Sequence, residues 1–299
     1  MSGPLVTFIL IIFIIIAILL GMIVHEIGHF IFAKIFKVSV KEFSIGIGPK
    51  IYSKEFKRTK FSFRPILLMA YVLIDSKKLN NTYTEIYNET KKEYDEYLKV
   101  NNPDSSVKRK ISKLEKEMEK YKKLTYIGPN HLFIDDIKLW KKELIYFGGV
   151  LFNLLTFLIF FLIQYFGFNY TLNPFVQLGD SFLIMFKNMV FYNAWSNVTN
   201  SGTVFGDIAH ISNSGLLDNL NGNYISLILV NYFCLFNLMI FIFNLVPIPP
   251  LDGFKIVFDG IASGFKIKIS KKLELTLTYI GVSLLGYIFV TSIIADFLR

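Results

Sequence analysis

The amino-acid sequence predicts an α-helical membrane protein: four transmembrane helices with a membrane-associated β-hairpin and a cytosolic helical-hairpin insert. Two observations predict this class. Of the 299 residues, 53% are hydrophobic and 18% are charged, whereas a soluble domain carries about 25% charged residues. Four apolar runs are long enough to cross a bilayer, and a charged segment of helical pattern separates the first two. This composition excludes a soluble two-domain enzyme and a disordered chain, and the single cysteine, Cys234, excludes a secreted disulfide scaffold.

The four apolar runs extend over residues 5–24, 144–166, 225–246 and 275–298. The first run holds twenty residues without a charge, and at about 1.5 Å per helical residue it can cross a hydrocarbon core of roughly 30 Å. No Lys or Arg precedes this run and no small-residue cleavage site follows it, so we interpret it as a transmembrane helix rather than a cleaved signal peptide. The sequence thus predicts a multi-pass protein of the cell membrane.

The basic residues predict the orientation of the chain in the membrane. Of the 32 Lys and Arg residues, 25 lie between Lys34 and Lys142, and five lie between Lys255 and Lys272. Because connections rich in Lys and Arg stay in the cytoplasm, the first and third connections are predicted to be cytoplasmic and both termini to face outward. The net charge of +9 is mainly a topology signal, and no nucleic-acid partner is expected.

Two different pieces are predicted between the first two spans. Residues 43–74 contain Gly46, Gly48 and Pro49 and then alternate between polar and apolar side chains, which is typical of a β-hairpin. Residues 82–124 are charged, and a heptad-like apolar seam follows positions 107, 111, 114, 118 and 121. The seam predicts a cytosolic helical hairpin that packs on itself; a coiled coil that binds a partner is the alternative.

The sharpest feature of the sequence is the motif His25-Glu26-Ile27-Gly28-His29 at the end of the first span. Residues four apart lie on one face of a helix, so both imidazoles can reach one zinc ion while Glu26 stands beside the bound water. The alternative is that the two histidines only form hydrogen bonds inside a helix bundle and bind no metal. Ionisable clusters in a membrane span are costly and are functional by default, so we predict that His25 and His29 bind a metal.

A catalytic zinc ion usually has three protein ligands and one open position, and the third ligand is predicted to be Asp252. Span three enters from outside and reaches the cytoplasmic edge near Val246, where three prolines break the helix and Asp252 follows. Span one reaches the same edge near His25. Irregular backbone at this depth occurs only where it is buried in protein or lines a wet cavity. An Asp that only caps a helix is the alternative, and the convergence with the histidines favours a ligand.

Span two carries Gly148, Gly149 and Asn153 near its cytoplasmic start. The glycines permit close approach of another helix. Asn153 could donate a hydrogen bond to a substrate carbonyl or to a developing oxyanion, or it could join two helices. The remaining histidines, His131 and His210, have no partner at ligand spacing, so we expect neither to take part in function.

These features divide the chain into three parts. Residues 1–75 hold the first transmembrane helix with the zinc motif and the membrane-associated β-element. Residues 76–130 form the cytosolic charged helical insert, and residues 131–299 hold transmembrane helices two to four with the third zinc ligand.

With these motifs in this order, the chain resembles the site-2 protease family of intramembrane zinc metalloproteases, of the bacterial regulator-of-sigma-E protease type but without PDZ domains. The matching segments are HEIGH at 25–29, FSIGIGPK at 43–50, Gly149-x-x-x-Asn153, and NLVPIPPLDG at 244–253. HExxH in one span with NxxPxPxLDG in a later span is highly specific. The connection of about 167–224 is too short for a PDZ domain.

The resemblance implies a zinc metalloendopeptidase that hydrolyses peptide bonds in or near transmembrane segments, in regulated intramembrane proteolysis or in the removal of signal-peptide remnants. The implied residues are the Zn²⁺ ligands His25, His29 and Asp252, the catalytic base Glu26, and the substrate-positioning pair Asn153 and Asn244. The β-element at 43–74 would receive an extended substrate strand. The implied partners are single-span membrane proteins or signal peptides and the lipid bilayer. A protein partner at the 76–130 insert is not implied by the resemblance and follows only from the coiled-coil alternative.

A membrane zinc-binding or zinc-transporting protein without hydrolytic activity is the alternative function. Transport favours acidic and His residues distributed across the membrane depth, whereas here they cluster at one edge, and Glu26 would have no purpose. A third possibility, an inactive scaffold that recruits partners through the insert, is disfavoured because His25, Glu26, His29 and Asp252 are all intact.

Overall fold

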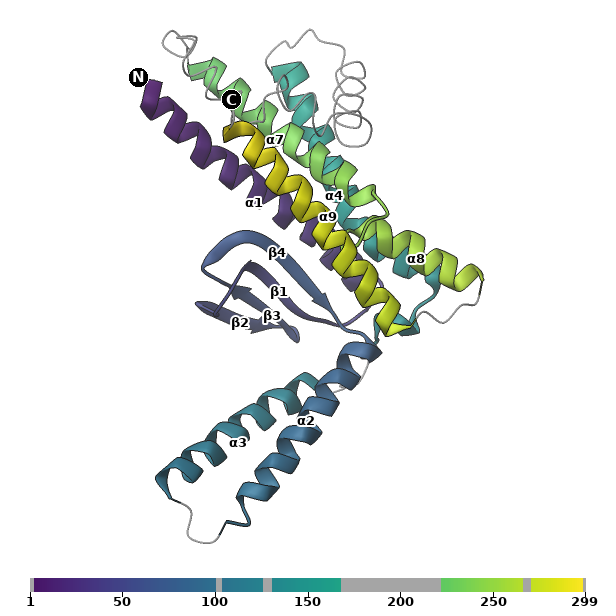
Figure 1. The fold of residues 1–299 in the computed structure, drawn as a ribbon. Coiled ribbons are helices and arrows are strands. Elements are labelled where there is room, and N and C mark those ends of the chain that lie inside the picture. The colour runs from purple at the N-terminus through teal and green to yellow at the C-terminus, as the bar shows by residue number, and fades with distance from the viewer. Residues whose placement is uncertain (1–2, 101–103, 126–130, 168–221, 266–269, 298–299) are drawn as a thin grey trace. The chain divides into compact units, whose positions relative to one another are not determined.

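The computed structural model describes residues 3–100, 104–125, 131–167, 222–265 and 270–297. Within these ranges the chain is mostly helical with one small β-sheet (Figure 1), as the sequence predicts. The chain divides into two compact units, one made of residues 1–28 and 146–299 and the other of residues 29–145. The predicted connection between spans two and three, together with His210, lies outside the described residues.

Each predicted span coincides with a long helix of the structure. These helices are α1 (Gly3–Ile35), α4 (Leu139–Gly167), α7 (Gly222–Leu245) and α9 (Lys271–Phe297). Among the described residues, the segments Ile15–Ile35 and Leu139–Gly167 are long and apolar enough to cross a membrane. α1 continues well past the apolar run that ends at Val24, so the HEIGH motif lies inside a continuous helix and its two histidines are one turn apart.

In the first unit, glycines bring the helices into close contact. A Cβ added to Gly28 of α1 would lie 2.6 Å from the carbonyl carbon of Gly148 and 2.9 Å from Cα of Gly149 in α4. The two helices therefore touch backbone to backbone at this point, as the predicted role of the glycines requires. Between α4 and α7 a core cluster of side chains excludes solvent; its buried members are Phe157, Phe161, Cys234, Leu238 and Ile242.

The β-element in the second unit is larger than the predicted hairpin. It has four strands, β1 (Val40–Ile47), β2 (Tyr52–Phe56), β3 (Thr59–Phe63) and β4 (Ile66–Ile74), in the order β2-β3-β1-β4. β2 and β3 form an antiparallel hairpin, β3 pairs in parallel with β1, and β1 pairs antiparallel with β4. The predicted hairpin is thus one part of a mixed sheet with β2 and β4 at its edges.

A polar cluster on the sheet centres on the Glu42 carboxylate of β1. It accepts hydrogen bonds from Ser62 Oγ at 2.6 Å and from Arg64 Nη2 at 2.9 Å, and Lys50 Nζ lies 3.1 Å away. Burial alone would raise the pKa of Glu42, but the hydrogen bonds from Ser62, Arg64 and Lys50 together outweigh it and hold the pKa below its usual value.

The insert is a pair of helices, α2 (Lys77–Tyr97) and α3 (Ser105–Thr125), which Figure 1 shows side by side. Ser76 caps α2 because its hydroxyl accepts a hydrogen bond from the Leu79 amide at 3.1 Å. The predicted seam faces α2: Leu114 is buried, and the rings of Tyr121 and Tyr83 lie 6.1 Å apart. Within the described residues, α2 and α3 thus lie where the sequence predicts a charged helical segment.

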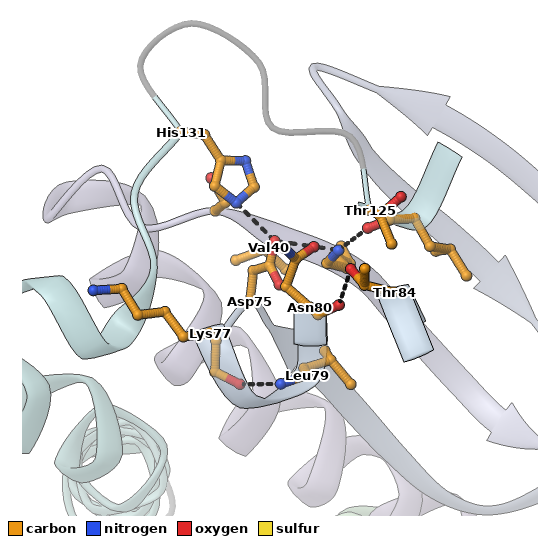
Figure 2. A network of polar contacts seen from close by, with 12 residues as sticks. Val40, Asp75, Lys77, Leu79, Asn80, Thr84, Thr125 and His131 are labelled. Carbon is orange, nitrogen blue, oxygen red and sulfur yellow. Dashed lines mark hydrogen bonds and ion pairs between the residues drawn. The ribbon is translucent and has the colours of Figure 1, made fainter. Parts of the chain in front are cut away.

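A buried carboxylate joins the insert to the sheet. Asp75, at the end of β4, has no exposed surface, and its Oδ2 lies 2.8 Å from His131 Nε2 and 3.3 Å from Lys41 Nζ. Figure 2 shows His131 and Asp75 pointing toward one another. Burial raises the pKa of Asp75, and the charges of Lys41 and His131 oppose this shift. The sequence offers no partner for His131 at ligand spacing; the structure supplies one from a distant strand.

Both ends of the insert leave the sheet at nearly the same point. The Asp75 amide donates to the Ser39 carbonyl at 2.8 Å, and the Ile134 amide donates to the Asp75 carbonyl at 3.0 Å. The Ser39 amide in turn donates to the Leu132 carbonyl at 2.9 Å. After a short 3₁₀ helix, η1 (Ile134–Asp136), the chain enters α4.

Candidate metal centre

His25 and Asp252 meet although they lie far apart in the sequence. His25 Nε2 lies 2.8 Å from Asp252 Oδ2, and the two residues are only 7% and 4% exposed. α7 ends at Leu245, the Pro-rich turn 246–251 follows, and α8 (Asp252–Gly264) begins with Asp252 itself. The next residue, Gly253, packs so closely that an added Cβ would lie 2.6 Å from the Leu245 carbonyl carbon. The backbone that carries Asp252 is therefore tightly fixed.

His29 lies one turn beyond His25 on the same face of α1 and is also buried. Its Nδ1 lies 2.7 Å from the main-chain carbonyl oxygen of Ile145. Since a carbonyl can only accept, Nδ1 must carry the proton, which leaves the lone pair on Nε2. This arrangement fixes the ring and the tautomer in the way that metal-binding histidines require.

One ligand atom from each of His25, His29 and Asp252 lies within 4.8 Å of the other two, and all three residues are buried. Two imidazole nitrogens and one carboxylate oxygen are the donors that catalytic zinc sites use, with a fourth position left for water. Buried ionisable groups are costly unless they are paired or bind a metal. The donor types, their separation and their burial fit a zinc ion.

The other predicted residues differ in their surroundings. Glu26 is partly buried on α1, next to His25. Asn153 of α4 is completely buried, and no residue of the described part of the chain hydrogen-bonds its side-chain Nδ2 or Oδ1. Asn244 is partly buried near the end of α7, and its Nδ2 donates to the Ile240 carbonyl of its own helix at 3.0 Å. Asn153 thus keeps hydrogen-bonding capacity for another group, whereas Asn244 already uses part of its own.

Sequence reasoning missed two residues that adjoin the centre. Lys255 Nζ lies 2.8 Å from Asp252 Oδ1, the oxygen that does not face His25. The same Nζ lies 5.8 Å from the ring centroid of Tyr146 in α4, within range of a cation–π contact. The spacing of three residues between Asp252 and Lys255 on one helix was the available signal, but nothing in the sequence indicates the contact with Tyr146.

Comparison with known proteins gives a family match along most of the chain. The family model described as peptidase family M50 matches residues 3–288. A Fusobacterium nucleatum protein is 46% identical over 71 residues, which are 23% of this chain and 21% of that protein. A Borreliella burgdorferi protein is 33% identical over 164 residues, or 54% and 29% of the two chains. One from Thermotoga maritima is 44% identical over 85 residues, or 28% and 16%.

Each of these three relatives bears the name "Putative zinc metalloprotease". The matched segments span less than a third of the length of each relative.

Proposed function

The chain belongs to peptidase family M50, and from this premise we propose that it is a zinc metalloendopeptidase that cleaves peptide bonds within or beside the membrane-spanning segments of other proteins. One observation carries the proposal: His25, His29 and Asp252 offer three buried ligand atoms within 4.8 Å of one another. Glu26, the proposed base, directly follows His25 on α1.

The proposed ligands are the imidazoles of His25 and His29 and the Oδ2 oxygen of Asp252. The hydrogen bond between His29 Nδ1 and the Ile145 carbonyl at 2.7 Å holds one of these rings in place. When bound, zinc supplies a Lewis acid that polarises a peptide carbonyl and makes water nucleophilic at neutral pH.

The chain's own residues would move the protons and hold the substrate. Glu26 accepts a proton at its carboxylate from the attacking water and then delivers it to the leaving amine nitrogen, so the base is regenerated when the peptide bond breaks. The buried Nδ2 of Asn153 can donate a hydrogen bond to a substrate carbonyl oxygen. Such a donor, fixed before the reaction, stabilises the negative charge that develops there.

We further propose that α1, α4, α7 and α9 all cross the membrane, with the metal centre near the cytoplasmic face. Support comes from the two apolar segments Ile15–Ile35 and Leu139–Gly167 and from the four apolar runs of the sequence. The lysines just after the first span and just before the second span, which flank the sheet and the insert in the sequence, support this orientation.

A substrate helix hides its carbonyls in hydrogen bonds within the helix, so it must unwind before it can be cleaved. A free sheet edge can replace those bonds by strand addition. β4 forms one edge of the sheet, and Ile66, Leu67 and Met69 on it are exposed. The apolar β4 edge suits a segment that comes from a membrane better than the polar β2 edge does.

Because the substrate helix must unwind before cleavage, we expect substrates with Gly or Pro near the cut to be cleaved faster.

The direct test uses the purified full chain in detergent with a tagged single-span substrate. We expect Glu26→Gln to bind zinc as the wild type does but to cleave at least about 100-fold more slowly. Asp252→Ala should lose bound zinc, and a chelator should stop cleavage by the wild type. Glu89→Gln, the same change at an exposed position of α2, is the matched control and should change nothing.

Cleavage by Glu26→Gln at the wild-type rate, or cleavage that survives complete removal of zinc, would overturn the proposal. Zinc flux across proteoliposomes without any cleavage would support the transport alternative instead.

A further inference from the structure

We propose that Lys255 is a positioning residue for the metal centre: it holds one carboxylate oxygen of Asp252 so that the other oxygen alone faces the metal. The inference rests on the proposed function, since it assigns Asp252 as a metal ligand. It adds a residue that lies outside the predicted ligands and base.

The two oxygens of Asp252 make different contacts. Oδ2 lies 2.8 Å from His25 Nε2, and Oδ1 lies 2.8 Å from Lys255 Nζ. A hydrogen bond to an ionised acceptor is among the strong ones. Oδ1 is thus engaged by a cation, while Oδ2 meets the His25 imidazole. Asp252 would therefore bind through one oxygen and leave room for water.

Lys255 is able to fix the carboxylate because the parts around it are themselves fixed. The close contact of Gly253 with Leu245 restricts the backbone at the start of α8. Lys255 then restrains rotation of the Asp252 side chain through Oδ1, as His25 does through Oδ2. Its own ammonium group lies 5.8 Å from the Tyr146 ring centroid, so α4 restrains the Lys255 side chain from the other side.

An ordinary surface ion pair is the simpler explanation, because Lys255 and Asp252 are three residues apart and the Lys255 side chain is 49% exposed. Such pairs contribute little when both partners are exposed. Here the Asp252 side chain is only 6% exposed, and its Oδ2 oxygen already contacts His25, another proposed ligand. The contact therefore acts on the geometry of the metal centre rather than on the helix surface.

The test compares metal binding by the full-length protein and by the variants Lys255→Met and Lys255→Arg. Zinc affinity is measured by competition with a chromophoric chelator, and ligand geometry by the visible absorption of Co²⁺ in the same site. We expect Lys255→Met to bind zinc about tenfold more weakly, as loss of an outer-shell partner does, and to shift the Co²⁺ bands. Lys255→Arg, which keeps the charge, should restore both. Lys272→Met, at an exposed lysine of α9, is the matched control.

Wild-type affinity and an unchanged Co²⁺ spectrum in Lys255→Met would overturn the inference. Equal losses in Lys255→Met and Lys255→Arg would overturn it as well, because the charge would then not be the cause. Failure of the proposed function shows differently: the wild type would bind zinc but cleave no substrate, while the effect of Lys255 on the metal would persist.

Discussion

Replacing Gly28 with alanine tests how strongly the metal centre depends on the contact between α1 and α4. Gly28 lies between His25 and His29, on the turn of α1 that carries both imidazoles. Any movement of this turn therefore moves two proposed ligands at once.

The structure gives the size of the perturbation. The new Cβ would lie 2.6 Å from the Gly148 carbonyl carbon and closer still to its oxygen, whereas ordinary van der Waals contact begins at 3.4 Å, so the helices must separate by more than roughly 0.8 Å. The obstructing atoms belong to the backbone, and no change of rotamer can move them. Overpacking costs about 1–3 kcal/mol, and exchanging Gly for Ala inside a helix returns about 1 kcal/mol. We therefore expect the variant to fold.

The effect on the metal centre should be larger than the effect on folding. Functional groups must be held within about 0.5 Å of their working geometry, and a misplacement of about 1 Å can reduce a rate about 100-fold. We expect Gly28→Ala to cleave at least about tenfold more slowly and to bind zinc more weakly. The assay measures zinc per chain and the cleavage rate on the same preparation.

Two other glycines provide a graded control. Gly286→Ala in α9 should change nothing, because in the described part of the chain no atom beyond the neighbouring backbone of α9 lies within 4 Å of the added Cβ. Gly21→Ala should have a small effect, because its closest contact is the flexible end of Ile240, at 2.8 Å. Wild-type zinc affinity and cleavage in Gly28→Ala would refute the reasoning.

Two further predictions concern charges in the second unit. Because the folded-state pKa of Glu42 lies below its usual value, its contribution to stability is present above about pH 4.5 and is lost as the pH falls through the folded pKa. Hydrogen exchange of β1 and β3 should show this loss in the wild type and a flat profile in Glu42→Gln; equal profiles would contradict it. His131→Ala leaves the buried Asp75 carboxylate with less compensation, so the base of the insert should open faster at pH 7 by local hydrogen exchange. Since burial already raises the pKa of Asp75, acid should partly slow this faster exchange in His131→Ala. The double variant His131→Ala/Asp75→Asn should lose the pH dependence of the exchange. Unchanged exchange in His131→Ala would argue against the pairing of His131 with Asp75.

The helical part of the fold could be predicted because its signals are local. Apolar length predicts α1, α4, α7 and α9, and the heptad seam predicts the buried Leu114 of α3. The apolar run stops at Val24 and does not show where α1 ends; the helix carries the polar motif and continues to Ile35. The sheet was underestimated because the parallel pairing of β1 with β3 joins strands that no turn signal connects.

The candidate site was predicted to the extent that motif spacing determines it. His25 and His29 share a helix face, and topology brings the turn before Asp252 toward the same end. The contacts of Lys255 with Tyr146 and of His131 with Asp75 could not be foreseen. Both depend on how distant segments pack, and sequence periodicity carries no information about such pairs.

The root of the insert has a consequence for how this chain can vary. Asp75 at the strand end and the returning segment at Leu132 and Ile134 are hydrogen-bonded to the same short stretch of backbone. The chain therefore enters and leaves the insert at adjacent points of the sheet. A module attached in this way can be lengthened, trimmed or exchanged without disturbing the strands beneath it, since its two attachment points stay the same distance apart. We therefore expect related chains to differ in length at this position while they keep the sheet.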